Sequence, residues 1–307
     1  GEVDRAIRMH QALIDRQDLS VEQRQAALFE LAQDYHKAGM LDRAEQLFGK
    51  LRDSEHAGEA LRFLLEIYVT EKDWPKAVDT AKALEGRSSE PLNKEIANYY
   101  CELAAGEYAH SRPQEAREYL DKALQENRKC VRAYLMLGDW AAKEGRHSEA
   151  VEQWKKVEGQ NPAYLFLVAD RLLQSYRTLG RTQEGLTLLR GFQERYPAMG
   201  LLDAAFQATL EGEGAQAAYN LAREDLRRNP TLPGLDKFLE AQLLDAADER
   251  RGDLQLVKGL VQSHSARFAY YQCVQCGFKA RQFYWHCPAC GNWESFPPRR
   301  HAEREPA

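Results

Sequence analysis

The stretch Tyr134–Pro162, YLMLGDWAAKEGRHSEAVEQWKKVEGQNP, decides the fold of the chain. It contains large and small residues at helical spacing, a glycine between two helical segments, and a proline after the second one. These residues are Tyr134, Leu137, Gly138, Gly145, Ala150, Trp154, Val157 and Pro162. Small residues let two helices approach closely, and large ones fill the space beside them. The stretch therefore predicts two packed helices joined by a tight turn.

The same pattern recurs along the chain and matches the tetratricopeptide repeat, a helix pair that stacks on its neighbours into a superhelix. The equivalent positions of the first two copies lie 33 residues apart, and the third copy is weaker, with a turn lengthened around Gly86–Pro91. Any one copy taken alone fits a simple amphipathic helix, but unrelated helices would not keep this spacing. The other copies occupy residues 28–48, 61–84, 100–123, 172–197 and 202–230, and residues 235–264 are expected to form a closing helix pair.

The first residues, GEVDRAIRMHQAL, match only the second half of a repeat, with Gly1 in the turn and Ala6 in the small-residue position. The chain also starts with glycine where a complete protein would start with methionine. We therefore expect the sequence to be a piece of a longer protein, whose preceding part includes at least one helix and possibly a membrane anchor.

Composition and charge indicate a folded, helix-rich chain in two parts. Hydrophobic residues make up 44% and charged residues 29%, which does not resemble a disordered chain. The longest apolar run, 164–169, is too short to cross a bilayer. Residues 267–300 carry a net charge of +4, whereas residues 1–266 carry −8 and the tail −1, for a total of −5. The basic end and the acidic body should attract each other.

Four of the six cysteines form two copies of one motif, Cys273-Val-Gln-Cys276-Gly277 and Cys287-Pro-Ala-Cys290-Gly291. In each motif two thiolates can face one ion, while glycine accepts the tight turn. The four thiolates predict a closed site for one zinc ion, with iron possible. Two disulfides are the alternative reading, but Cys101 and Cys130 lie singly in the repeats, which is unusual for a disulfide-bonded protein. His286 is adjacent to Cys287, but four cysteines already complete the site, so a surface or packing role is expected for it.

These features together resemble a known family. The two cysteine motifs are similar to those of a rubredoxin-like zinc ribbon. The segment between them is much shorter than in rubredoxins, which argues against electron transfer by iron. Tetratricopeptide repeats followed by the run WHCPACGNW (Trp285–Trp293) resemble the lipopolysaccharide assembly protein B (LapB) family of Gram-negative bacteria along nearly the whole chain. The resemblance implies an adaptor at the cytoplasmic face of the inner membrane, held by an N-terminal helix. Its implied partners are the FtsH protease, the LpxC deacetylase, whose degradation it promotes, and other lipopolysaccharide-assembly proteins.

Three classes of function remain to be compared from the residues. An enzyme is disfavoured, because a four-cysteine site has no open position and no motif for a nucleophile or a phosphate loop is present. A zinc ribbon that binds nucleic acid is an alternative, but the acidic body opposes it. A protein-interaction scaffold is favoured, since stacked repeats form a long concave surface. Positions where some repeat proteins clamp a terminal carboxylate hold other residues here, so a folded partner or internal peptide is expected. These candidate groove positions are Phe29, Arg62, Cys101 and Leu135.

The sequence thus predicts a mainly helical protein with three segments. Residues 1–264 form the repeat array, 265–300 the four-cysteine ribbon, and 301–307 a tail. The short connection around Ser263–Phe268 suggests that the ribbon packs against the repeats, with Arg267, Lys279 and Arg281 facing acidic helices and aromatic contacts supplying most of the energy. No nucleic acid is expected as a partner, and a homo-oligomer is possible.

Overall fold

The computed structural model describes residues 2–87, 91–197, 200–265 and 271–298. The chain divides into two compact units, residues 1–130 and 131–307. Both are built from helices, and only the second contains strands among its described residues, which confirms the predicted fold class: a mainly helical repeat protein with a small C-terminal ribbon.

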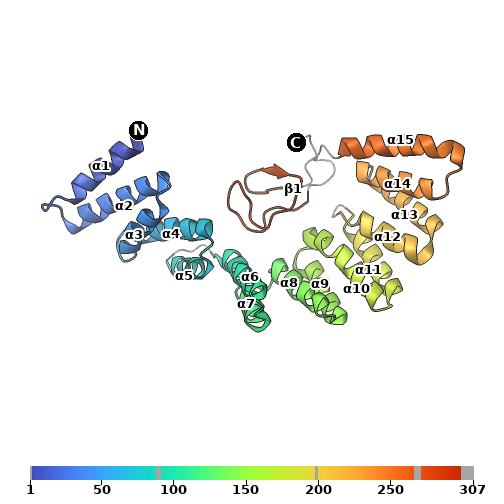
Figure 1. Ribbon diagram of the computed structural model, residues 1–307, viewed down its shortest axis with the longest axis horizontal. Helices are drawn as coiled ribbons and strands as arrows, with labels where there is room; N and C mark the ends of the chain where they lie inside the picture. Colours follow the sequence, from blue (N-terminus) through green and yellow to red (C-terminus); the bar gives the residue numbers. More distant parts are fainter. Residues whose placement is uncertain (1, 88–90, 198–199, 266–270, 299–307) are drawn as a thin grey trace. The chain divides into compact units, whose positions relative to one another are not determined.

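The first unit consists of successive helices that pack on their sequence neighbours (Figure 1). Helix α1 packs on α2, as expected for the second half of a repeat, and α2–α3, α4–α5 and α6–α7 form the following pairs. The helices are α1 Glu2–Ile14, α2 Val21–Lys37, α3 Leu41–Lys50, α4 Ala57–Glu71, α5 Trp74–Glu85, α6 Asn93–Ala109 and α7 Pro113–Glu126.

The second unit continues the same arrangement and ends in the ribbon (Figure 1). A short 3₁₀ helix, η1 Pro162–Leu167, follows the second helix of the first pair, and strands β1 Tyr271–Gln272 and β2 Lys279–Ala280 pair antiparallel in the ribbon. The α-helices are α8 Val131–Lys143, α9 His147–Gln160, α10 Ala169–Thr178, α11 Thr182–Arg195, α12 Leu202–Glu213, α13 Ala215–Arg228, α14 Leu232–Leu244 and α15 Asp248–Ser265. The predicted closing pair is α14–α15. The predicted boundary at residue 264 stays a prediction, because residues 266–270 lie outside the described part. None of the described helices combines the length and the apolarity that membrane crossing requires.

The turns inside five helix pairs share one geometry. After the first helix, one residue takes a left-handed conformation, with φ between 59° and 77°, and the next amide donates to the carbonyl five residues earlier, at 2.8–3.0 Å. This is the Schellman end of a helix, which favours glycine because it has no Cβ. The left-handed residues are Gly39, Lys72, Ser111, Gly145 and Gly180. Gly39, Gly145 and Gly180 are therefore helix stops, and Lys72 and Ser111 take the same conformation with a side chain.

The small residues of the pattern lie where the helices of a pair touch. Ala44, Ala77, Ala116 and Ala150 are fully buried. Gly138 of α8 lies against Trp154 of α9, whose indole N–H donates to the carbonyl of Leu135 at 3.3 Å. These contacts explain why the pattern alternates small and bulky residues, since the bulky ring of one helix needs a position without a side chain on the other.

We predict that Gly138→Ala destabilises the second unit, because its new Cβ would overlap the indole ring of the buried Trp154. Overpacking of this kind costs about 1–3 kcal/mol, and Ala150→Trp at the fully buried small position should cost at least as much. Denaturant unfolding followed by circular dichroism measures the loss. The matched control is Gly159→Ala in α9, where a Cβ meets no atom within 4 Å; it should be neutral or stabilising by up to about 1 kcal/mol. Equal effects at both glycines would contradict this helix register.

Candidate metal centre and its contact with the repeats

The ribbon presents its cysteines on two similar turns. In the first, the amide of Cys273 donates to the carbonyl of Phe278 and that of Gly277 to Cys273, both at 2.9 Å. In the second, the amide of Cys287 donates to Asn292 and that of Gly291 to Cys287, again at 2.9 Å. Gly277 and Gly291 have φ of 76° and 72°, a conformation that side chains disfavour. The glycine after each cysteine pair is thus required to turn the chain back around the sulfur atoms.

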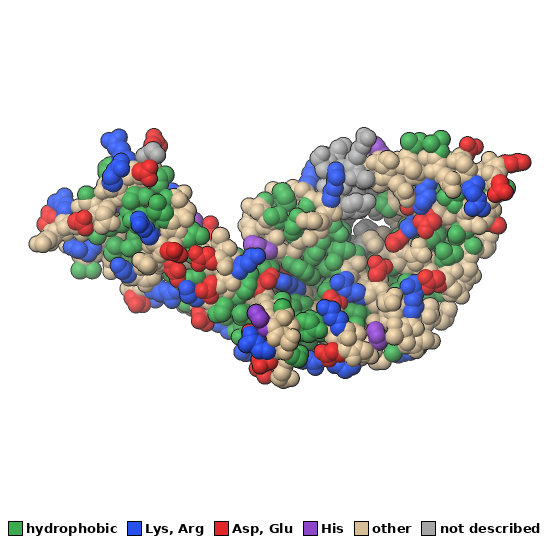
Figure 2. All heavy atoms as spheres, viewed as in Figure 1, with side chains coloured by type: hydrophobic (Ala, Val, Ile, Leu, Met, Phe, Trp, Pro, Cys, Tyr) green, Lys and Arg blue, Asp and Glu red, His purple; other side chains and the backbone are tan. Residues whose placement is uncertain are grey.

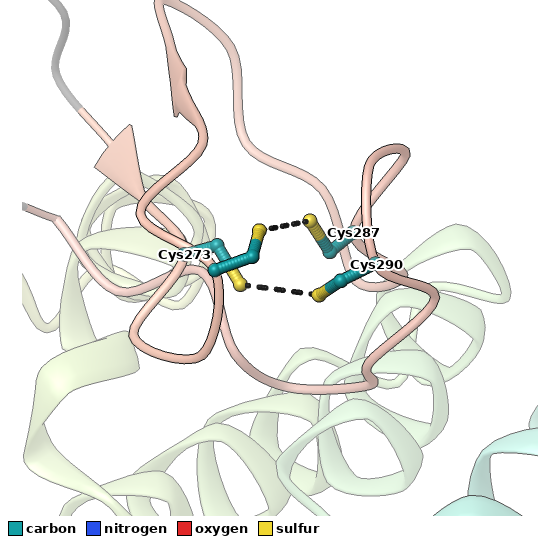
Figure 3. Close-up of side chains that lie close together, drawn as sticks. Cys273, Cys287 and Cys290 are labelled. Atoms are coloured by element: carbon teal, nitrogen blue, oxygen red, sulfur yellow. Dashed lines mark hydrogen bonds between the residues drawn. The ribbon is translucent and has the colours of Figure 1, made fainter.

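The two turns bring four sulfur atoms together. Figure 3 shows Cys273, Cys287 and Cys290 pointing toward a common centre. The Sγ atoms of Cys273 and Cys290 are 3.6 Å apart and those of Cys276 and Cys287 are 3.8 Å apart, and all four lie within 4.8 Å of one another. Sulfur ligands at about 2.3 Å from a tetrahedral zinc ion lie about 3.8 Å apart. The four thiols therefore have the spacing that such an ion needs, and all six cysteines of the chain are free thiols.

The electrostatics of the cluster also fit a cation. Burial opposes ionisation of Cys273, but the Ser295 hydroxyl and nearby amides outweigh it and lower the pKa of the Cys273 thiol to about 6. The Phe278 amide favours the Cys276 thiolate, yet loss of hydration and the neighbouring thiols raise the pKa of Cys276 to about 12. Each thiolate therefore disfavours ionisation of the neighbouring thiols. A divalent cation would offset this repulsion by stabilising all four thiolates.

Aromatic rings build the rest of the ribbon. Phe296 is fully buried beside the cysteines, with ring centroids of Tyr284 at 5.6 Å and Phe278 at 6.1 Å. The His286 ring packs on buried Trp293, with centroids 4.6 Å apart. The ring contact agrees with the packing role expected for His286. This small segment has a compact aromatic cluster beside the sulfur atoms, and segments of this size commonly need a metal ion in addition to packing.

The ribbon packs on the 3₁₀ helix η1 of the repeats. Tyr164 is 1% exposed, and its ring stacks on Trp285 with centroids 5.5 Å apart and meets the edge of Phe283 at 5.9 Å. Its hydroxyl donates to the carbonyl of Glu294 at 2.9 Å. Burial and the nearby Glu294 charge raise the pKa of Tyr164, so the hydroxyl stays a donor over the whole neutral pH range. Phe283 and Trp285 thereby join the main hydrophobic cluster of the second unit.

A second group of contacts surrounds this centre. Phe166 of η1 lies 5.6 Å from the Tyr271 ring and 5.7 Å from the Phe283 ring. From the start of α8, the Arg132 guanidinium lies 5.5 Å from the Trp293 ring and 6.0 Å from that of Trp285. Figure 2 shows hydrophobic side chains gathered where the ribbon meets the repeats. The predicted docking is confirmed, and rings together with a cation on the repeats form it.

Comparison with known proteins agrees with this architecture. A family model described as a rubredoxin metal binding domain matches residues 271–298, and a tetratricopeptide repeat model matches residues 101–163. Lipopolysaccharide assembly protein B of Escherichia coli (strain K12) is 33% identical over 303 residues, covering 98% of this chain and 78% of that protein. The chain belongs to the lipopolysaccharide assembly protein B family. The Haemophilus influenzae (strain ATCC 51907 / DSM 11121 / KW20 / Rd) protein is 35% identical over 301 residues, covering 97% and 76%. The crystal structure of MamA protein aligns at 18% identity and a TM-score of 0.37, over 62% of this chain and 95% of that one.

This family member differs in one respect from the docking predicted from charge. The cation in the contact, Arg132, belongs to the repeats and faces ribbon aromatics, whereas the prediction placed the cations on the ribbon. Arg267 lies outside the described residues. Arg281 is exposed, and for it and Lys279 the pairing with acidic helices stays a prediction. Formal charge pointed to the correct neighbours, but it could not show that desolvated rings would form the contact.

The candidate groove residues fall into two groups. Phe29, Cys101 and Leu135 are buried and serve the core, and the Sγ of Cys101 lies 3.8 Å from that of Cys130. Arg62 is exposed and meets Phe29 at one pocket between α2 and α4. The other residues of this pocket were not predicted from the sequence, although three lie one helical turn from Phe29 or Arg62 and the fourth directly follows Arg62. These residues are Gln33, Glu59, Phe63 and Glu66.

We predict that Tyr164→Phe loosens the ribbon, because it removes the hydrogen bond to Glu294 at a net cost of about 1 kcal/mol. Tyr164→Ala also removes the ring contacts and should cost about 3–5 kcal/mol. Hydrogen exchange of residues 271–298 should accelerate in that order, while circular dichroism reports unchanged helix content. Tyr219→Phe is the control, since its ring packs on Phe238 within the repeats. Unchanged ribbon exchange in Tyr164→Ala would contradict the docking.

Proposed function

We propose that this chain is a non-enzymatic scaffold of lipopolysaccharide assembly, acting at the cytoplasmic face of the inner membrane. Membership of a family whose curated relatives are named lipopolysaccharide assembly proteins supports the process. Stacked helix pairs support the scaffold, because such repeats bind partners along extended surfaces. In this proposal the protein is held at the membrane, and the repeats and ribbon reach the partners.

The observation that carries the scaffold proposal is the buried Tyr164 contact. It fixes the ribbon on the second unit through ring stacking and a hydrogen bond to Glu294. A partner that binds there meets ribbon and repeat side chains on one rigid surface. Such a composite surface suits an adaptor that holds a client and a protease together, because binding to parts that are already fixed loses little conformational entropy.

Two other functions are less well supported by the same geometry. The four thiolates would occupy all four coordination positions of a tetrahedral ion, so the site offers no position for a reacting water. In a nucleic-acid binder, aromatic rings of the ribbon would stack on bases. Here Trp285 and Trp293 lie against Tyr164 and Arg132. This engagement favours the protein-binding reading.

For the ion itself we propose one zinc per chain held by Cys273, Cys276, Cys287 and Cys290, with iron as the alternative. When bound, the ion would supply structural cross-linking of the two turns. Each thiolate would bind through Sγ, while the backbone amides near the sulfur atoms and the Ser295 hydroxyl orient them.

Removal of the metal should unfold the ribbon and spare the repeats. Metal analysis of the purified chain should give close to one zinc, and a strong chelator or Cys287→Ser should lower that value. Hydrogen exchange should then become fast in residues 271–298 and stay slow in α9 to α13, because small metal domains are often unfolded without their ion. Full protection of residues 271–298 in a chain freed of metal would rule out this role.

The partners we propose are the LpxC deacetylase as client and the FtsH protease, with the chain promoting proteolysis of the client. In cells carrying the full-length protein, Cys287→Ser should raise the amount of the deacetylase several-fold by slowing its degradation. Cys101→Ser makes the same chemical change at a buried cysteine outside the cluster and should leave the amount unchanged. Normal deacetylase turnover in the Cys287→Ser strain would refute the adaptor role.

A further inference from the structure

Two phenylalanines, Phe29 and Phe63, line the pocket between α2 and α4, and further rings pack on them. Phe29 and Phe63 meet edge to face with centroids 6.0 Å apart, His56 stacks on Phe29 at 4.9 Å, and His36 meets Phe63 at 5.3 Å. Phe48 supports Phe63 from behind at 4.8 Å. The pocket measures about 380 Å³, a size at the lower end of ligand sites. It can therefore accept one large apolar side chain.

The rim of the pocket is acidic. Glu59 and Glu66 line it with side chains 67% and 62% exposed, and Arg62 is the one basic residue among the lining residues. Glu59 lies 3.6 Å from His56 Nδ1 and Glu66 lies 3.8 Å from His36 Nε2, so with neutral histidines the lining has a net charge of −1. A cation beside the apolar group of a ligand would meet carboxylates, whereas an anion would be repelled.

The position of the pocket indicates a peptide as its occupant. Its lining residues all belong to α2 and α4, the first helices of two consecutive pairs. Stacked repeats present an extended surface to protein ligands. The α2–α4 pocket lies in the first unit, on two such neighbouring pairs.

We infer that the α2–α4 pocket binds an internal peptide segment of a protein partner that carries a large apolar residue next to lysine or arginine. The apolar side chain packs against Phe29 and Phe63, and its basic neighbour lies beside Glu59 and Glu66. The inference rests on the proposed function only in taking protein partners as the ligands. It names the chemistry of the recognised segment, which neither the family nor the metal centre specifies.

Fluorescence anisotropy with the purified full chain tests this pairing. The probes are labelled 12-residue glycine–serine peptides with Phe-Lys, Phe-Glu or Ala-Lys at the centre. Phe-Lys should bind at least about 10-fold more tightly than either other peptide, a difference of about 1.4 kcal/mol. Equal affinities, a preference for Phe-Glu, or no binding of Phe-Lys at about 1 mM would overturn the inference.

Charge reversal locates the site. Glu59→Lys with Glu66→Lys changes two exposed side chains, so folding should be preserved, and the preference should shift from Phe-Lys to Phe-Glu. Glu115→Lys with Glu118→Lys on the exposed part of α7 makes the same change of net charge and should leave the preference intact. An equal shift in both variants would assign the effect to overall charge and overturn the pocket as the site. Because no protease or deacetylase is present, the result is independent of the adaptor experiment in cells.

Discussion

The stacking of Tyr164 on Trp285 is the contact that places the ribbon on the repeats. One buried ring joins the core of the repeats to that of the ribbon, and its hydroxyl holds the backbone at Glu294. Without this contact the ribbon would be a small domain on a short connection. With it, the cysteine cluster and the ribbon aromatics are held against the repeats, because the contact buries surface that the ribbon alone would leave exposed.

Most of the fold could be predicted because tetratricopeptide packing is local. Gly138 and Trp154 lie close in sequence, so a pattern of small and large residues shows their contact directly. The same is true of the turns at Gly39, Gly145 and Gly180, where the left-handed backbone conformation favours glycine. Lys72 and Ser111 take the same conformation without that signal in the sequence.

The clustering of Cys273, Cys276, Cys287 and Cys290 was equally predictable, because they lie within one short segment. The residues through which the ribbon contacts the repeats could not be predicted. Tyr164 and Glu294 are separated by 130 residues, and nothing in the apolar run around Tyr164 marks it as an interface instead of a core. Net charge suggested that the parts attract, but charge acts at long range and does not select which rings meet. The α2–α4 pocket could be predicted only in part. Phe29 and Arg62 were found from their positions in the repeat, whereas the acidic rim was identified only in the structure.

The long separation between Tyr164 and Glu294 has a consequence for the order in which the chain folds. Helix pairs form from near neighbours, so the repeats can fold one after another as the chain leaves the ribosome. The ribbon leaves last, and Tyr164 must wait for it with an apolar ring exposed. If the four cysteines hold the proposed ion, maturation of the second unit ends with ion binding and formation of the ring contact at η1, so a shortage of the ion would leave newly made chains with folded repeats and an exposed apolar surface.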